Sequence, residues 1–256
     1  MTVHEAARRG FEREAQAYDR GRPEYPAAAI DYLADQLGLR PGRIVADVGA
    51  GTGKLTQALE HTGAELVAVE PVAAMRELLA RALPAARVLD ATAEGLPLAG
   101  GSIDAIVVGQ AFHWFDGPRA LREFHRVLCP EGRLALVWNR RRYEQPLHAA
   151  IEEIIAPYRG ATPSHRSGQW RGALEATDLF EPIGERVLPF VHVLSREQLV
   201  DRVASTSFIG ALDEREQAAV LARVRGIAHS DTVELGYECE VSVFGRLAAR
   251  RGGSRR

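Results

Sequence analysis

The segment Gly49 to Gly53 places a glycine at every second position, directly after an apolar run typical of a β-strand. Glycine is unfavourable there unless the backbone adopts a positive φ or a partner approaches it closely. A helix-forming segment begins at Lys54, so N–H groups of a helix N-terminus lie beside the turn and favour an anionic or hydroxylated ligand. Tight packing of strand against helix is the alternative explanation of these glycines.

The spacing of the glycines narrows the choice of ligand. Dinucleotide-binding turns follow G-x-G-x-x-G, whereas this turn is G-x-G-x-G and carries Lys54 at the position that should be small. Glu70 ends the next apolar run, where a carboxylate can accept hydrogen bonds from ribose hydroxyls. A solvent-facing carboxylate at a strand end is the alternative. The pattern favours a ribose-containing ligand and disfavours NAD or NADP.

The segment QAFHWFD, residues 110–116, combines polar and aromatic side chains after another apolar run. His113 is the candidate for a general base or for orienting an acidic substrate group. A packing or hydrogen-bonding role is the alternative for a histidine among aromatic residues. Trp114 and Phe115 are candidates for the wall of a substrate pocket, or else for the core.

A second polar and aromatic segment, AYDRGRPEYP, lies near the N-terminus at residues 17–26. The hydroxyl groups of Tyr18 and Tyr25 and the guanidinium of Arg22 could together position a carboxylate. The alternative is that the tyrosines only anchor a leading helix. Further along the chain, Trp170, Phe208 and the run 205–207 are candidates for lining an acceptor pocket.

The strands and helices that would position these residues are predicted by an alternation of apolar and helix-forming segments. Expected strands lie within 43–49, 64–71, 86–90, 101–110 and 133–139, and expected helices at 25–39, 54–63, 73–84 and 118–132. Such alternation predicts βαβ units and a parallel sheet covered on both faces. After residue 139 the pattern predicts helices at 146–158, 169–180, 195–206 and 213–230 and strands at 185–195 and 233–247.

Composition excludes several classes of protein. The 256 residues carry a formal net charge of −2, which gives no general attraction to nucleic acid or to a membrane surface. Cys129 and Cys239 stand apart, without the spacing of metal ligands, and we expect free thiols and no metal site. The charged N-terminus is unlike a signal peptide and no apolar run approaches a membrane span. We expect a cytoplasmic protein.

Four motifs in order resemble those of the class I S-adenosylmethionine-dependent methyltransferases. They are VADVGAGTG at 45–53, VAVEP at 67–71, the segment 90–114 and the segment 120–139. The resemblance is close over residues 40–139 and is of the methyltransferase type 11 kind. AYDRGRPEYP and QAFHWF together resemble the subgroup that includes trans-aconitate methyltransferase-like enzymes.

This resemblance implies a binding site for S-adenosylmethionine. Asp47 and the backbone of Gly49, Ala50, Gly51 and Gly53 would hold the methionyl end, and Glu70 with Pro71 the ribose. Thr92, Ala93 and Glu94 would form the adenine pocket, although relatives commonly carry Asp-Ala where this chain has Thr92-Ala93. Asp90 stands two residues too early to replace that aspartate. Gln110 would contact the donor, and Tyr18, Arg22, Tyr25 and Trp114 would close over donor and substrate.

It also implies an α/β fold, a Rossmann-like doubly wound, seven-stranded mixed sheet whose last strand is antiparallel, with helical lid insertions. We expect one domain over residues 1–245, comprising N-terminal lid helices at 1–40, a cofactor-binding core at 41–139, and substrate-covering helices with the final strands at 140–245. The arginine-rich tail at 246–256 is expected to be disordered.

The sequence thus predicts an S-adenosylmethionine-dependent methyltransferase that releases S-adenosylhomocysteine. The absence of a basic face and of a nucleic-acid module favours a small-molecule acceptor, with no nucleic acid or membrane partner. An oxygen acceptor is preferred on account of His113 and the trans-aconitate-like motifs. A non-catalytic S-adenosylmethionine-binding protein and, less well, an NAD(P)-dependent oxidoreductase remain alternatives. An RNA methyltransferase would rest on the arginine tail alone.

Overall fold

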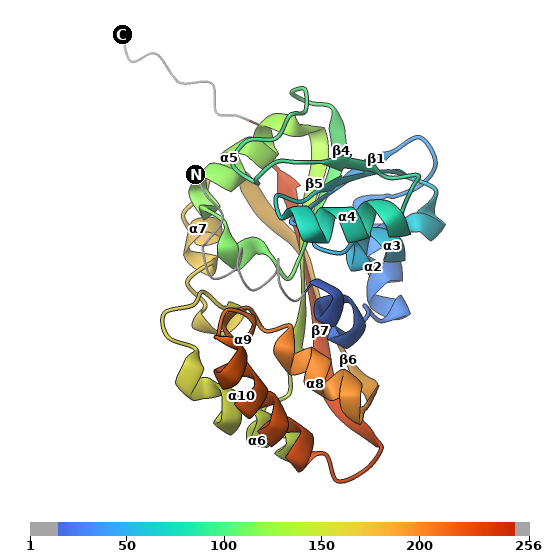
Figure 1. Ribbon diagram of the computed structural model, residues 1–256. Helices are drawn as coiled ribbons and strands as arrows, with labels where there is room; N and C mark the ends of the chain where they lie inside the picture. The colour runs from blue at the N-terminus through green and yellow to red at the C-terminus, as the bar shows by residue number, and fades with distance from the viewer. Residues whose placement is uncertain (1–14, 249–256) are drawn as a thin grey trace.

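The computed structural model describes residues 15–248 and is built around one seven-stranded sheet (Figure 1). Its strands are β1 (Ile44–Val48), β2 (Glu65–Val69), β3 (Arg87–Leu89), β4 (Ile103–Gly109), β5 (Leu128–Arg141), β6 (Phe180–Ser195) and β7 (Thr232–Arg246). They follow the order β3-β2-β1-β4-β5-β7-β6. The first five pair in parallel, whereas β7 pairs antiparallel with both β5 and β6. The predicted mixed sheet with an antiparallel last strand is confirmed.

Neighbouring residues of the parallel strands β1 to β5 point to opposite faces of the sheet, and both faces are apolar. Helices therefore cover both faces. Val45 packs with α2 (Ala27–Leu37) and α3 (Lys54–Ala58), whereas Ala46 packs with α5 (Gly117–Val127). The ends of these helices follow from local residues. Gly38 closes α2 in a left-handed conformation, φ 63°, and Asp116 caps α5 by accepting a hydrogen bond from the Arg119 N–H.

The remaining helices and turns connect these strands or lie beyond the sheet. They are the 3₁₀ turns η1 (Glu60–Thr62), η2 (Phe112–Trp114), η3 (Ala156–Tyr158) and η4 (His165–Ser167), and the helices α4 (Ala73–Ala82), α6 (Pro146–Ile155), α7 (Arg171–Glu175), α8 (Arg196–Ala204), α9 (Ser207–Gly210) and α10 (Glu214–Ile227). Helices α6, α8 and α10 pack together against one end of β6 and β7, in the lower half of Figure 1. They form a third apolar cluster, beside those on the two faces of the parallel sheet.

Several predicted boundaries were wrong. The helix expected over 118–132 ends at Val127, and β5 begins at Leu128, where it pairs with Ile103. Pro130 has no N–H to continue a helix, so the chain turns directly into an extended strand. Strand β6 begins at Phe180 rather than 185, because its first residues pair with the end of β7. Helix α7 is only five residues long, Arg171–Glu175, and α9 was not predicted.

The two ends of the chain fall partly outside the described residues. Residues 15–21 are helical and belong to the expected N-terminal lid. Strand β7 continues to Arg246, one residue beyond the predicted domain boundary, and residues 249–256 of the predicted tail lie outside the described range. Among residues 15–248, no helix combines the length and apolarity needed to cross a membrane.

Candidate active site

The glycine turn is the link between β1 and α3, and its backbone is pinned to β2. Gly49, Gly51 and Gly53 all have positive φ, at 74°, 61° and 92°. The Gly49 and Ala50 N–H groups donate to the Val69 carbonyl oxygen, at 2.9 and 3.1 Å. The Gly51 N–H donates to Glu70, and the Gly53 N–H donates to the Ala50 carbonyl. Because these N–H groups already have partners, the turn offers a ligand close approach rather than free donors.

The three glycines serve different purposes. A Cβ on Gly49 would lie 2.7 Å from the Ala111 Cβ, and one on Gly53 would lie 3.0 Å from the Leu79 Cγ. These two glycines therefore let the turn pack against neighbouring elements. A Cβ on Gly51 would meet no atom closer than Met75 Sδ at 3.8 Å. At Gly51 a side chain would project into open space. Tight packing therefore explains Gly49 and Gly53, and close approach of a ligand explains Gly51.

Glu70 is a buried carboxylate at the end of β2, not a solvent-facing one. Its side chain is 5% exposed, and its two oxygens accept hydrogen bonds from the Gly51 and Val72 N–H groups, each at 2.8 Å. Burial raises the pKa of Glu70, and the two backbone hydrogen bonds partly offset this. Each carboxylate oxygen keeps a second lone pair, so the group can still accept from a ligand's hydroxyls.

Beside Glu70 lies a cavity, the first cavity, of about 810 Å³ including its opening to solvent. Its size fits a small organic ligand. The predicted site residues that line it are Tyr18, Gly49, Gly51, Glu70, Pro71, Thr92, Ala93, Glu94, Gln110 and Trp114. The sequence did not single out Val72, Met75, Ala91, Gly109 and Ala111, which also line it; Phe115, expected in the wall of a substrate pocket or in the core, lines it too. Gly53 does not line this cavity.

The turn after β3 forms part of the wall of the first cavity. Thr92 bridges to Gly95, and the Glu94 Oε1 accepts a hydrogen bond from the Asp116 N–H at 2.9 Å. Asp90 does not line the cavity; its exposed carboxylate lies 2.9 Å from the Arg76 guanidinium. Asp90 therefore does not replace the aspartate that relatives commonly carry, whereas Thr92, Ala93 and Glu94 line the cavity.

Gln110, at the end of β4, has a strained backbone. Its φ of 60° is the only positive value at a non-glycine residue within 15–248. Such a conformation costs about 1–3 kcal/mol and persists mainly at functional sites. A hydrogen bond from the Gln110 N–H to the Val137 carbonyl, at 2.9 Å, holds it in place. Gln110 lines the first cavity and the two cavities described next.

Asp47 lies below the glycine turn, beside a third, smaller cavity that Gly49, Ala50 and Tyr25 also line. Asp47 is 2% exposed; Oδ2 accepts a hydrogen bond from Thr56 at 2.6 Å, and the buried Oδ1 has no hydrogen-bond partner among residues 15–248. Burial raises the pKa of Asp47 to about 7. A ligand's ammonium group would give this carboxylate the partner that it lacks.

The second cavity is larger, about 1600 Å³ including its opening to solvent, and joins the first at Tyr18, Gln110 and Trp114. Arg22, His113, Ser207 and Phe208 line it as predicted. Trp170 does not; it is buried in the core against Phe112 and Trp138. Ser205 is also buried, where it accepts a hydrogen bond from Arg22. Residues missed by the sequence include Trp138, Asn139, Arg140, Arg141, Tyr143, Arg159, His165 and Arg202.

His113 lies in the wall of the second cavity between two indole rings. Its ring centroid is 4.7 Å from that of Trp114 and 5.4 Å from that of Trp138, and its Nδ1 is buried without a partner. Burial, with smaller contributions from His165 and Arg22, lowers the pKa of His113 to about 3. The imidazole is therefore neutral around pH 7.

The predicted lid residues fall into two places. Tyr18 lies over the turn, with Cε1 3.9 Å from the Cβ that Gly51 lacks, and Arg22 donates to Ser205 Oγ at 3.1 Å. Tyr18 and Arg22 both line the second cavity. Tyr25 is deeper: its hydroxyl would lie 2.5 Å from a Cβ on Gly109, and burial raises its pKa well above the ordinary value. Tyr25 lines only the third of the three cavities.

Comparisons with known proteins agree with this geometry. The family model of a methyltransferase domain matches residues 46–136. An uncharacterized methyltransferase of Mycobacterium bovis is 38% identical over 228 residues, covering 86% of this chain and 89% of that protein. A trans-aconitate 2-methyltransferase of Paracidovorax citrulli is 29% identical, over 82% of this chain and 86% of that protein.

Two solved structures share the fold. The YcgJ protein of Bacillus subtilis superposes with a TM-score of 0.56 at 19% identity, over 87% of this chain and all of that one. A geranyl diphosphate methyltransferase in complex with S-adenosylmethionine superposes with a TM-score of 0.51 at 20% identity, over 86% of this chain and 85% of that one.

The residues present fit S-adenosylmethionine. The buried Glu70 carboxylate has lone pairs to spare for ribose hydroxyls, Gly51 leaves its side of the cavity open, and the unpartnered Asp47 Oδ1 matches an amino group. With the relatives and the sheet order, these observations show that the chain belongs to the class I S-adenosylmethionine-dependent methyltransferases.

Proposed function

We propose that this enzyme methylates an oxygen atom of a small-molecule acceptor bound in the second cavity. One observation carries this proposal: the second cavity meets the first at Tyr18, Gln110 and Trp114, so ligands in the two cavities would face each other there. The donor supplies an electrophilic methyl group, and the protein has to align the acceptor with it and exclude water.

The preference for oxygen rests on the charge of the second cavity. Arginine is the most frequent charged residue of its lining, so the cavity favours an anionic acceptor, which offers oxygen atoms, over one that carries an ammonium group. The name of the Paracidovorax relative gives trans-aconitate, a carboxylic acid, as the acceptor of that protein. Carboxylic and hydroxy acids are therefore the first acceptors to test.

Donor binding is assigned to the residues of the first and third cavities. Asp47 accepts a hydrogen bond from the donor's amino group, the backbone of Gly49, Ala50 and Gly51 lets the methionyl end approach, and Glu70 accepts from the ribose hydroxyls beside Pro71. Thr92, Ala93 and Glu94 surround the adenine ring, and Gln110 contacts the donor between the cavities. Gly53 supports this site indirectly, through the packing of α3 against Leu79.

The raised pKa of Asp47 predicts how donor affinity depends on pH. The carboxyl is protonated in the free protein below about pH 7, and an ammonium ion prefers the carboxylate. We expect the Kd of S-adenosylmethionine to fall by up to about tenfold per pH unit between pH 5 and 7 and then to level off. Calorimetric titrations at several pH values measure this.

Asp47→Asn is the matching control for the pH series. It removes the titrating group and keeps its size, so donor binding by this variant should be weaker above pH 7 and flat with pH. The same pKa shift has the opposite effect on the stability of the free protein. Because folding raises the pKa of the Asp47 carboxyl, the free energy of unfolding falls as pH rises from about 4 to about 7. A wild-type Kd for S-adenosylmethionine that stays constant between pH 5 and 7 contradicts the assignment of Asp47 to the donor's amino group.

His113 is proposed to accept a hydrogen bond from the acceptor's hydroxyl or carboxyl group through its unpartnered Nδ1. Its low pKa predicts that the wild-type profile of kcat/KM has no step between pH 6 and 8 caused by His113. His113→Ala should lower kcat/KM by about tenfold, the loss expected for one hydrogen bond. Unchanged kcat and KM in this variant would show that the ring only packs against Trp114 and Trp138.

The experiment that tests the proposed function has two steps. Calorimetry with S-adenosylmethionine and S-adenosylhomocysteine, and with NAD and NADP as controls, should give micromolar binding of the first two alone. Release of S-adenosylhomocysteine is then measured against a panel of carboxylic and hydroxy acids, amines and RNA. Turnover with an acid supports the proposal, whereas turnover only with an amine or RNA, or donor binding without any turnover, contradicts it.

A further inference from the structure

Arg202 on α8 is a buried cation, and no carboxylate within residues 15–248 forms an ion pair with it. Its side chain is 4% exposed and borders the second and third cavities. Its Nε donates to the Tyr237 hydroxyl at 3.0 Å, while its Nη1 is buried without a hydrogen-bond partner. Removing a guanidinium from water without an opposite charge is costly, so an arginine in this position indicates a missing anionic partner.

The arginines of the second cavity fall into two groups. The first group is already neutralised by glutamates: Arg140 by Glu238 and Glu240, Arg171 by Glu240, and Arg159 and Arg166 by Glu152. The cavity's other acidic residue, Glu144, pairs with Arg142 at 2.7 Å.

The second group consists of Arg22, Arg141 and Arg202, and we call it the free arginine cluster. Within residues 15–248, none of these three forms an ion pair with a carboxylate. Burial lowers the pKa of both Arg22 and Arg202, and the charge of Arg141 lowers each further. Neighbouring positive charges repel one another and so lower one another's pKa. An anion bound beside them would offset this repulsion.

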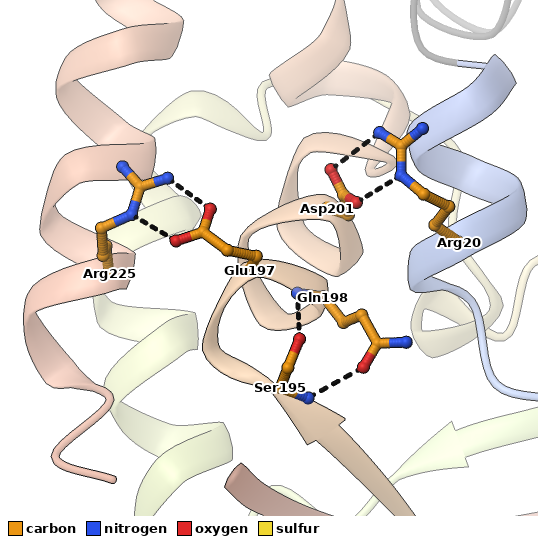
Figure 2. A network of polar contacts seen from close by, with 6 residues as sticks. All are labelled: Arg20, Ser195, Glu197, Gln198, Asp201 and Arg225. Atoms are coloured by element: carbon orange, nitrogen blue, oxygen red, sulfur yellow. Dashed lines mark hydrogen bonds and ion pairs between the residues drawn. The ribbon is translucent and has the colours of Figure 1, made fainter. Parts of the chain in front are cut away.

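The surrounding structure holds the cluster in place. Figure 2 shows α8 capped by Ser195 and Gln198, which exchange hydrogen bonds of 2.8 and 3.2 Å, and joined to α10 by Glu197 and Arg225. Asp201, next to Arg202, pairs with Arg20 of the N-terminal segment at 2.7 Å.

The N-terminal segment also packs tightly onto α8 beside the cluster. A Cβ on Gly21 would lie 2.3 Å from the Arg202 backbone nitrogen, so only glycine permits this approach. The next residue, Arg22, donates to both the hydroxyl and the carbonyl oxygen of Ser205, at 3.1 and 2.9 Å. Guanidinium groups fixed in this way lose little further freedom when they bind a ligand.

We propose that the free arginine cluster is an oxyanion subsite, which binds a carboxylate or phosphoryl group of the acceptor other than the atom that is methylated. The inference rests on the proposed function, because it assumes that the acceptor occupies the second cavity. It makes the acceptor a molecule with at least two functional groups, one reacting at the junction with the first cavity and one held by the arginines. Arg202 and Arg141 then determine which acceptors bind.

The test uses simple probes on the full-length protein saturated with S-adenosylhomocysteine. Glutarate and glycerol 3-phosphate supply the two oxyanions, and glutaramide is the neutral counterpart of glutarate. Calorimetry should show at least one anion binding ten times more tightly than glutaramide. Arg202→Met and Arg141→Met should each weaken that anion at least tenfold, with the Kd of S-adenosylhomocysteine within twofold of the wild type.

Arg196→Met is the matched control, because Arg196 lies on the same helix, is 40% exposed and does not line the second cavity. It should leave both affinities within twofold. Thermal unfolding will show whether Arg202→Met folds. If it does not, Arg141→Met still tests the proposal, because Arg141 is only half-buried and its substitution disturbs the fold less.

Three results would overturn the proposal: no preference for an anion over glutaramide, equal losses for anion and glutaramide in the variants, or a tenfold loss of S-adenosylhomocysteine affinity in Arg202→Met. The last result would assign the arginines to the donor's own carboxylate. Failure of the proposed function is distinguishable, since it shows as wild-type protein that does not bind the donor or does not turn over acids.

Discussion

Gly51→Val is expected to abolish measurable binding of S-adenosylmethionine in a protein that still folds. The substitution costs about 1–2 kcal/mol of stability, because a residue with a Cβ is strained at a φ of 61°. The new side chain has room in the free protein, since its Cβ would lie 3.8 Å from Met75 Sδ and 3.9 Å from Tyr18 Cε1. That room belongs to the first cavity, where the donor's methionyl end is placed. We expect at least a hundredfold loss of affinity by calorimetry.

Gly101→Val separates backbone strain from loss of space. Gly101 has a similar φ of 68°, no atom lies within 4 Å of its missing Cβ, and it does not line the first cavity. This variant should lose a similar amount of stability and keep its donor affinity within about twofold. Normal donor binding by Gly51→Val, or an equal loss of binding by Gly101→Val, would show that close approach to Gly51 is not what the donor requires.

The donor side of the molecule was predictable because its signals are local in sequence. The glycine turn, Glu70 and Thr92–Glu94 each follow directly after a strand, and parallel strands bring their carboxyl ends to one edge of the sheet. The first cavity accordingly contains most of the residues that the motifs implied. Local sequence did not show that the turn's N–H groups are occupied within the protein, since that depends on how β1 lies against β2.

The second cavity, which we propose for the acceptor, was poorly predicted because tertiary structure assembles it. Trp138 and Arg141 belong to β5, His165 to η4 and Arg202 to α8, and each looks ordinary in its own segment. Only the long β6–β7 pair, which carries α6, α8 and α10 beyond the sheet, brings them to one cavity. Nor does sequence distinguish the ion-paired arginines from the free ones, because their glutamate partners lie on other elements, Glu238 and Glu240 on β7 and Glu152 on α6.

The positions of Tyr25 and Trp170 show the same limit in single residues. Both are aromatic residues near predicted substrate-covering segments. Tyr25 instead packs against Gly109 beneath the glycine turn, and Trp170 packs against Phe112 and Trp138 in the core. An aromatic side chain in a short helical or turn segment can face either a cavity or the core, and the neighbouring layers decide which.

Glu70→Ala is expected to weaken donor binding by about 10- to 150-fold, which corresponds to about 1.5–3 kcal/mol for a lost hydrogen bond to a charged group. The substitution also removes the acceptor of the Gly51 and Val72 N–H groups, so the melting temperature should fall. Asp90→Ala is the control, because Asp90 follows the next strand, β3, is exposed and pairs with Arg76. Its donor affinity should stay within twofold of the wild type.

A loss of affinity in Glu70→Ala has two possible origins, and a second ligand pair separates them. If Glu70 accepts hydrogen bonds from the ribose, the wild type should bind adenosine more tightly than 2′,3′-dideoxyadenosine, and the variant should lose this preference. If Glu70 acts only by holding the glycine turn, both nucleosides should lose affinity by the same factor and the preference should persist. Donor affinity within twofold of the wild type would contradict both roles, and the ribose would then have to be bound by other residues.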